Sequence, residues 1–273
     1  NNDTMSHFNG KNVLITGGAS GIGKIMGRLS LEKGANTLII WDINEKNIEA
    51  TIQELQSLGT VKGYVVDVTN EEQVKSTYQQ VKSEIGEVNV LINNAGIIRG
   101  NRTFDKQTTQ DIRLTFEVNT IAPMLLTLQV LPDMLQRNEG HIVNIASQAG
   151  MISNPTISVY AASKWAVIGW SDSVRIEVQE AKSAVKITTV APYYINTGMF
   201  EGVQSRIFPI LEPEKTAKKI VRAVEKDSYF CGIPWSFHFV RFMQAILPTC
   251  VFDWFFGKVF GIYGAMKNFT GRK

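Results

Sequence analysis

Three residues near the middle of the chain could together move a proton to or from an alcohol: Ser147, Tyr160 and Lys164. If residues 157–181 form a helix, Tyr160 and Lys164 stand one turn apart and project from the same face. An ammonium within roughly 4–6 Å of a phenol favours the phenolate and lowers its pKa from about 10. Tyr160 could then accept the proton of an alcohol as hydride leaves its carbon, while Ser147 holds the oxygen.

A Tyr-x-x-x-Lys pair also occurs on helices without any catalytic function. Whether this pair is catalytic must therefore be judged from the neighbouring elements. Residues 11–16 suit a strand buried on both faces, and the glycine-rich run Thr16–Gly23 follows before a helical pattern that reaches about Lys33. Glycines allow a tight turn and let backbone N–H groups and a helix N-terminus approach a pyrophosphate. By itself the turn could be an ordinary loop. The expected cofactor contacts are Gly17, Ser20, Gly21, Ile22 and Gly23.

An acidic residue ends the second apolar run. Asp42 lies nineteen residues after Gly23, an interval at which a carboxylate hydrogen-bonds the adenine ribose of NAD and repels the extra phosphate of NADP. We therefore expect NAD(H) as the cofactor, with Asp42 and Ile43 at its adenosine end. The alternative is that Asp42 only caps the next helix.

The chain then alternates between helical and strand patterns as far as residue 233. Helices are expected at 44–57, 70–85, 108–137, 157–181 and 213–226, and strands at 61–66, 88–92, 140–146, 185–191 and 229–233. This alternation predicts parallel β-α-β crossovers and an α/β, doubly wound Rossmann fold. Ligands in such folds bind beyond the carboxyl ends of the strands.

Short polar or small segments follow several of these strands and are expected at the cofactor. They are Asp67 and Val68, then Asn93, Ala95 and Gly96, and finally Pro192, Ile195 and Thr197. For any one of them taken alone, ordinary turn chemistry is the better explanation. Asn119 falls inside an expected helix, where asparagine is unfavourable. It could be satisfied by its neighbours, or it could distort the helix and hold a water that leads to Lys164.

Composition excludes several classes of protein. The 273 residues are 44% hydrophobic and 19% charged, which is typical of a globular protein with a sizeable core. The net charge of +3 comes from scattered Lys and Arg residues, so no nucleic-acid surface is indicated. His7, His141 and His238 are too dispersed for a metal site, and Cys231 and Cys250 form no Cys-x-x-Cys motif. Without a secretory leader pattern, we expect a cytoplasmic protein.

Five motifs occur in a characteristic order and spacing: Thr16-Gly-x-x-x-Gly-x-Gly23, Asn93-Asn-Ala-Gly96, Asn119, Ser147 and Tyr160-x-x-x-Lys164. This set resembles the short-chain dehydrogenase/reductase family over roughly residues 10–233. The resemblance implies a single Rossmann domain with a seven-stranded parallel sheet and no metal. It also implies homodimers or homotetramers that pack through the helices expected at 108–137 and 157–181.

The resemblance further implies a catalytic tetrad. Tyr160 would be the acid/base, and Ser147 would orient the substrate oxygen. Lys164 would lower the tyrosine pKa and bind the nicotinamide ribose, while Asn119 would support a proton relay. Segments 38–44, 115–120 and 211–214 look most like the branch that contains retinol and 17β-hydroxysteroid dehydrogenases.

That branch suggests a hydrophobic alcohol, steroid-, retinoid- or lipid-like, as substrate of an NAD(H)-dependent oxidoreductase. The alternatives are an NAD(P)H-dependent reductase of a lipid or steroid ketone and a non-catalytic NAD-binding regulator. One departure concerns the substrate end, because Pro192-Tyr193-Tyr194 stands where the family has Pro-Gly. The expected substrate contacts are Ser147, Ile98, Met151, Ile157, Tyr193, Met199 and Phe200.

The chain is expected to divide into a lead at residues 1–9, the dehydrogenase domain at 10–233 and a helical extension of the same domain at 234–273. Residues 1–4 precede Met5 and are expected to be a tag remnant. The extension is rich in aromatics, and its charged residues leave it short of the roughly 20 apolar residues that span a bilayer. It could pack on its own core and a subunit partner, rest on a membrane surface through residues 234–269, or cover the substrate site.

Overall fold

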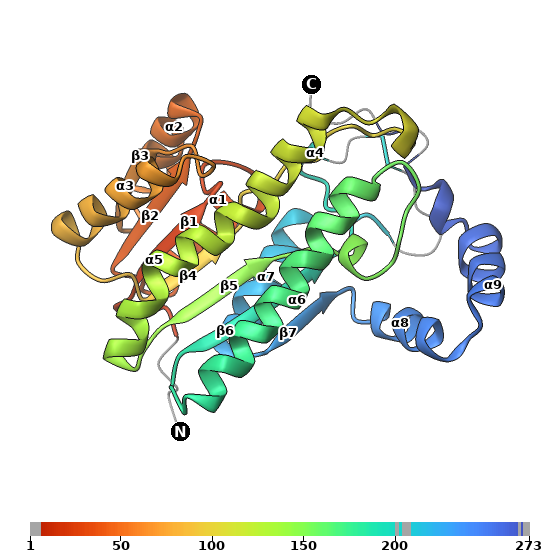
Figure 1. The fold of residues 1–273 in the computed structure, drawn as a ribbon. Coiled ribbons are helices and arrows are strands. Elements are labelled where there is room, and N and C mark those ends of the chain that lie inside the picture. Colours follow the sequence, from red (N-terminus) through yellow and green to blue (C-terminus); the bar gives the residue numbers. More distant parts are fainter. Residues whose placement is uncertain (1–6, 200–201, 204–208, 267–268, 270–273) are drawn as a thin grey trace.

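A single parallel sheet forms the centre of the protein. The computed structural model describes residues 7–199, 202–203, 209–266 and 269. The seven strands lie in the order β3-β2-β1-β4-β5-β6-β7, so the predicted doubly wound fold is confirmed (Figure 1). Their bounds are β1 Asn12–Thr16, β2 Thr37–Asp42, β3 Thr60–Val65, β4 Val90–Asn93, β5 His141–Ile145, β6 Lys186–Pro192 and β7 Phe230–Ile233. The strand order reverses between β1 and β4, which is where such sheets bind ligands.

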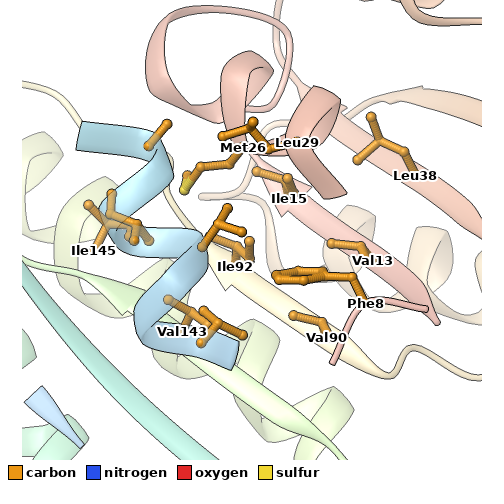
Figure 2. Close-up of a cluster of buried hydrophobic side chains, with 14 of the residues drawn as sticks. Phe8, Val13, Ile15, Met26, Leu29, Leu38, Val90, Ile92, Val143 and Ile145 are labelled. Carbon is orange, nitrogen blue, oxygen red and sulfur yellow. The ribbon is translucent and has the colours of Figure 1, made fainter. Parts of the chain in front are cut away.

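Helices cover both faces of the sheet. The helices are α1 Gly21–Glu32, α2 Glu45–Leu55, α3 Glu71–Glu84, α4 Thr109–Phe116, α5 Ala122–Arg137, α6 Ser158–Glu180 and α7 Pro213–Glu225. Because side chains alternate along a strand, Val13 and Ile15 pack toward α1 and α7, whereas Leu14 packs toward α3 and α5. Figure 2 shows the first of these two cores, which also takes in Phe8 from the N-terminal lead.

The long helix predicted at 108–137 is interrupted. Residues Glu117–Ile121 form a π-helical turn between α4 and α5, and Asn119 lies at its centre. A π turn holds one more residue than an α turn and is frequent at functional sites. Thr109–Arg137 as a whole is long and apolar enough to cross a membrane, but 44% of its most apolar window is buried within the fold. We interpret it as a core helix.

The C-terminal extension is helical, as predicted. It contains α8 Phe237–Ile246, α9 Thr249–Phe252, a π-helical segment Asp253–Val259 and a short 3-10 turn Ile262–Gly264. Figure 1 shows α8 directly after β7, with α9 farther out and away from the helices that cover the sheet. The extension therefore lies toward the carboxyl ends of the last strands.

Candidate active site

The glycine turn after β1 has the shape expected of a phosphate-binding loop. Gly17 and Gly21 adopt positive φ angles of 61° and 54°, a region that disfavours other residues. A Cβ on Gly23 would stand 2.3 Å from the carbonyl oxygen of Gly17. The first turn of α1 contains no acidic residue, and Ser20 makes no side-chain capping bond. The N–H groups that begin α1 thus suit an anion such as a pyrophosphate.

Asp42 connects the end of β2 to this turn. Its Oδ2 accepts a hydrogen bond from the N–H of Ala19 at 3.2 Å, and its Oδ1 accepts one from the N–H of Asn44 at 3.1 Å. The residue that caps α2 is Asn44, whose side chain accepts from the N–H of Asn47. This geometry rules out the alternative in which Asp42 is only the helix cap. Ile43 beside it is 69% exposed.

Thr16 and Asn94, which the sequence analysis did not assign to the site, fasten the glycine turn to β4. Asn94 Nδ2 donates to the carbonyl oxygens of Thr16 and Gly17, at 3.0 and 3.1 Å. Thr16 Oγ1 accepts from the N–H groups of Asn94 and Ala95, at 3.0 and 3.1 Å. The pairing of β1 with β4 brings these residues together, and that pairing cannot be read from either motif alone.

Asn93 behaves differently from its neighbour. Its Nδ2 donates to Asn144 Oδ1 at 2.8 Å and to Thr127 Oγ1 at 3.2 Å, so its side chain is engaged in the interior rather than at the turn. Asp67 Oδ1 accepts from the N–H and hydroxyl of Thr69, which is ordinary turn chemistry. A direct contact of either side chain with a cofactor stays a prediction.

The remaining expected cofactor residues lie around the same edge. A Cβ on Gly21 would stand 3.6 Å from the Cβ of Thr197, so the segment after β6 faces the glycine turn. Ile195 is buried and bridges to Leu211, and Pro192 ends β6. Val68 packs on the second core.

Ser147 and Tyr160 are in direct contact. Both are buried, and a side-chain hydrogen bond joins Ser147 to the phenol of Tyr160. Ser147 Oγ also accepts from the N–H of Ala149 at 3.2 Å, which fixes the short 3-10 turn Gln148–Gly150 after β5. The position after β5 and the first turn of α6 therefore supply a paired hydroxyl and phenol.

Lys164 reaches the same place from the next turn of α6. Its Nζ lies 5.9 Å from the centre of the Tyr160 ring and donates to the carbonyl oxygen of Ile145 at 2.9 Å. Burial lowers the pKa of Lys164 to about 8. Burial also raises the pKa of Tyr160 to about 12, and the hydrogen bond with Ser147 offsets only part of that rise. In the protein alone, desolvation thus outweighs the lowering of the tyrosine pKa expected from Lys164.

Asn119 is held by the π turn and completes this group. Its Oδ1 accepts from the N–H of Ile97 at 2.8 Å, and its Nδ2 donates to the carbonyl oxygen of Ile97 at 2.9 Å. Nδ2 also donates to Ser163 Oγ at 3.1 Å. A Cβ on Gly96 would stand 3.3 Å from Asn119 Oδ1 and 3.5 Å from Lys164 Nζ, so these residues converge. Both interpretations of Asn119 are supported in part. Neighbouring groups satisfy the hydrogen bonds of its amide, and the helix around it is distorted into a π turn.

A cavity of about 20 Å³ opens beside Ser147. Its walls are mainly apolar and aromatic, and they come from the turn after β5, the segment after β6 and the start of α8. The lining residues are Ser147, Gln148, Ala149, Ile152, Asn154, Tyr193, Tyr194 and Phe237. The tail thus contributes a wall of the site.

The expected substrate residues are divided between this cavity and its surroundings. Ser147 and Tyr193 line it. Ile157 and Ile98 pack in a cluster with Tyr160, which Ala265 and Met266 of the tail also join. Met151 is buried beneath the tail, and Met199 is half-buried, whereas Phe200 lies outside the described residues.

Comparison with known proteins agrees with this geometry. The family model for short chain dehydrogenase matches residues 11–207. The chain is 36% identical over 270 residues to epidermal retinol dehydrogenase 2 of Mus musculus, covering 97% of this chain and 86% of that protein. It is also 36% identical over 241 residues to estradiol 17-beta-dehydrogenase 11 of Homo sapiens, covering 88% of this chain and 80% of that protein. The chain belongs to the short-chain dehydrogenase family.

A solved structure supports the same conclusion. A short-chain dehydrogenase/reductase from Burkholderia phymatum, in complex with NAD, matches with a TM-score of 0.79 at 26% identity, covering 88% of this chain and 95% of that one. The predicted family, and its likeness to the retinol and 17β-hydroxysteroid branch, are thereby confirmed. This short-chain dehydrogenase is an oxidoreductase that acts on CH–OH groups.

Sequence reasoning about this dehydrogenase missed the residues that come from distant segments. Phe237, Tyr194 and Asn154 line the cavity, yet none belongs to a recognised motif. Gln148 directly follows Ser147, and this adjacency was the only signal in the sequence that could have indicated it. The sequence predicted one aromatic ring at the substrate end, that of Tyr193, where the family has glycine. Tyr194 lines the cavity as well, so two aromatic rings lie there.

Proposed function

We propose that this protein is an NAD-dependent dehydrogenase of a hydrophobic alcohol, with Tyr160 as the acid/base. The observation that carries the proposal is the burial of Ser147, Tyr160 and Lys164 in one group at the carboxyl edge of the sheet, next to a mainly apolar cavity. A buried hydroxyl and phenol that share a hydrogen bond can bind the oxygen of one alcohol.

The chain's own residues would divide the work. Ser147 would donate a hydrogen bond to the substrate oxygen while Tyr160 exchanges a proton with it. Lys164 holds a buried ammonium one helical turn away, and its charge favours the phenolate. Asn119 holds Ile97 and Ser163 in place next to Lys164. We include in the proposal that Asn119 supports a proton relay through a water that leads to Lys164.

The glycine turn and Asp42 support NAD as the cofactor. Bound there, NAD would accept the hydride and place a positive charge near Tyr160. The turn has the positive-φ glycines and uncapped helix start that a pyrophosphate needs. The carboxylate of Asp42 is fixed by two backbone N–H groups at the corner where the adenine ribose would lie, and its charge would repel the phosphate of NADP.

The test is NADH formation over a panel of secondary alcohols, steroids and retinol, with Tyr160→Phe as the matched variant. We expect turnover to fall by about 10²–10⁴-fold in the variant while NAD affinity is kept, because only the proton transfer is removed. Asp42→Asn, which keeps the side-chain shape, should bring NADP closer to NAD as a cofactor. Activity only with NADPH and ketones would favour the alternative carbonyl reductase. Cofactor binding without any turnover would favour a non-catalytic regulator.

We also propose that the C-terminal extension rests on a membrane surface. Helix α8 buries Phe237 and Val240 against the domain, whereas Phe239 and Phe242 point outward and are 59% and 60% exposed. Further exposed aromatic or aliphatic residues of the extension are Trp235, Ile246, Val251, Trp254, Phe255, Val259 and Phe260. Such an aromatic face accompanied by basic residues is typical of segments at the bilayer interface.

The charges in the extension fit anionic headgroups. Asp253 is hydrogen-bonded to Tyr263, and Arg241 and Lys258 give the described part of the extension an excess of positive charge. Flotation with vesicles that contain phosphatidylserine should retain the wild type and lose a variant with Phe239→Ser, Phe242→Ser and Trp254→Ser. Leu58→Ser is the control, because Leu58 is 44% exposed and precedes β3, at the opposite edge of the sheet from β7 and the extension. Equal flotation of all three proteins would contradict the proposal.

A homodimer or homotetramer forms a separate part of the proposal. The helices that the family resemblance assigns to subunit contacts, α5 and α6, expose Leu128 and Trp165, at 65% and 48%. These residues belong to other elements than the aromatic face of the extension.

A further inference from the structure

Gln148, the residue after the catalytic serine, is buried with half of its amide unpaired. Its Nε2 donates to the carbonyl oxygen of Ile233 at 2.7 Å. A backbone carbonyl only accepts hydrogen bonds, so this contact fixes which end of the amide carries the nitrogen. Oε1 is consequently a bare acceptor, and it has no hydrogen-bond partner among the described residues. Gln148 is 4% exposed.

A second unpaired acceptor lines the same cavity. Asn154 Nδ2 lies 3.2 Å from the hydroxyl of Tyr194, and Asn154 Oδ1 is buried without a partner within the described part of the chain. Gln148 and Asn154 both line the cavity that begins at Ser147. A buried acceptor without a donor is costly, so such groups are ordinarily paired. The site therefore offers acceptors that await a donor.

The size of the cavity limits what this donor can be. Its volume of about 20 Å³ accommodates one water-sized group, because a water needs roughly 10–15 Å³. One hydroxyl of a substrate fits this space. Ile152 and Phe237 supply apolar parts of the wall, and their side chains offer this hydroxyl no competing partner.

We propose that Gln148 Oε1 accepts a hydrogen bond from a second hydroxyl of the substrate, with Asn154 as an auxiliary acceptor. The substrate is then a hydrophobic alcohol that carries another hydroxyl close to the one that reacts at Ser147 and Tyr160. This inference rests on the proposed function, since it places the reacting oxygen at those two residues. Gln148 acts in specificity and not in proton transfer.

The discriminating power of such a site follows from its burial. A substrate without the second hydroxyl leaves the acceptors of Gln148 and Asn154 unpaired or keeps a water in the cavity. Sites built to hydrogen-bond a substrate hydroxyl reject analogues that lack it more strongly than apolar pockets reject a missing methylene. One neutral hydrogen bond of this kind predicts a preference of roughly 5- to 100-fold.

The experiment compares 2-decanol with a series of decanediols in which the second hydroxyl moves stepwise away from carbon 2. Two quantities are measured for each compound: kcat/KM with NAD, and the shift in unfolding temperature of the protein with NADH bound. Gln148→Met removes the acceptor and keeps the length of the side chain. Ile152→Val is the matched control, because it alters the same wall without altering an acceptor.

We expect one position of the second hydroxyl to give a roughly 5- to 100-fold preference over 2-decanol, and Gln148→Met to abolish that preference while 2-decanol is still used. Ile152→Val should keep the preference. If Gln148→Met does not fold, Asn154→Leu, which leaves the bond from Gln148 to Ile233 intact, should weaken the preference. Lack of any preference in the wild type, or a preference unchanged in the Gln148 and Asn154 variants, would mean that the cavity holds only water.

The two readouts separate this inference from the proposed function. If no alcohol is oxidised but one diol still stabilises the protein with NADH more than 2-decanol does, the diol site stands and the dehydrogenase activity fails. If 2-decanol and all diols are oxidised at similar rates, the activity stands and the diol site fails.

Discussion

The carboxyl edge of the sheet and the C-terminal extension are built by different interactions. At the edge, polar side chains are buried and held by hydrogen bonds, several of them to the backbone, as with Asn119 on Ile97 and Lys164 on Ile145. In the extension, Phe237, Phe252 and Phe256 are held by apolar packing on Met151 and Ile152. At the edge, hydrogen bonds fix the orientation of individual polar atoms. In the extension, the interaction depends on the apolar surface area that is buried.

This difference matches the role that we propose for each region. Proton transfer needs heavy atoms within about 2.6–3.2 Å of each other, and directional bonds to the main chain can hold such distances. Closing a cavity and contacting a lipid surface need apolar area, which is not directional. We therefore expect changes at the edge to affect chemistry and charge, and changes in the extension to affect packing.

The largest expected effect separates the two sides of α8. Phe237→Ala should destabilise the protein by about 3–5 kcal/mol, because a fully buried aromatic ring leaves a cavity when it is removed. Phe239→Ala, two residues along, should change the free energy of unfolding by about 0.5 kcal/mol or less, because that ring is exposed. Urea unfolding measures both, and similar losses would show that the extension has no distinct inner face.

The next effect concerns charge at the edge and depends on pH. Burial lowers the pKa of Lys164 from its ordinary value of 10.5 to about 8. As the pH rises from 8 to 10, the folded protein has released this proton while the unfolded chain still holds it, so stability should rise with pH. Over this range the contribution amounts to about 2–3 kcal/mol. Lys164→Met should lack this rise in urea unfolding at pH 8, 9 and 10, whereas Phe239→Ala should keep it.

The smallest effect tests the backbone of the edge. Gly23→Ala places a methyl group 2.3 Å from the carbonyl oxygen of Gly17, and overpacking of this kind costs about 1–3 kcal/mol. NAD affinity should fall with it, because the turn must move. Gly169→Ala is the control, since a Cβ there meets nothing within 4 Å in helix α6. It should be neutral or stabilise the protein by up to about 1 kcal/mol, as thermal unfolding and NAD titration would reveal.

The sequence predicted the strand-and-helix framework well, because local patterns encode it. The apolar run at β1 and the glycines after it identify a buried strand and a tight turn without knowledge of any neighbour. Asn119 was also informative, because an asparagine inside a helix signalled the distortion that is present as a π turn. Patterns that depend on one segment of chain were therefore readable.

Features that depend on two distant segments were not readable. Which of Asn93 and Asn94 faces the glycine turn depends on the pairing of β1 with β4. The contribution of Phe237 to the cavity depends on how the chain returns after β7. The pKa of Tyr160 was expected to fall because of Lys164, but its direction depends on the degree of burial, which no motif records.

The π turn at Glu117–Ile121 also bears on how this helix tolerates changes in length. An α-helix rotates by about 100° per residue, so the extra residue shifts the azimuth of α4 relative to α5. With this shift, Asn119 can face Ile97 while Leu126 and Val130 still face the sheet core. Deleting one residue there would convert the turn to α-helix and remove the turn that holds Asn119 toward Ile97. Asn119 and the packed core thus share a helix whose residue count, and not only its composition, is constrained.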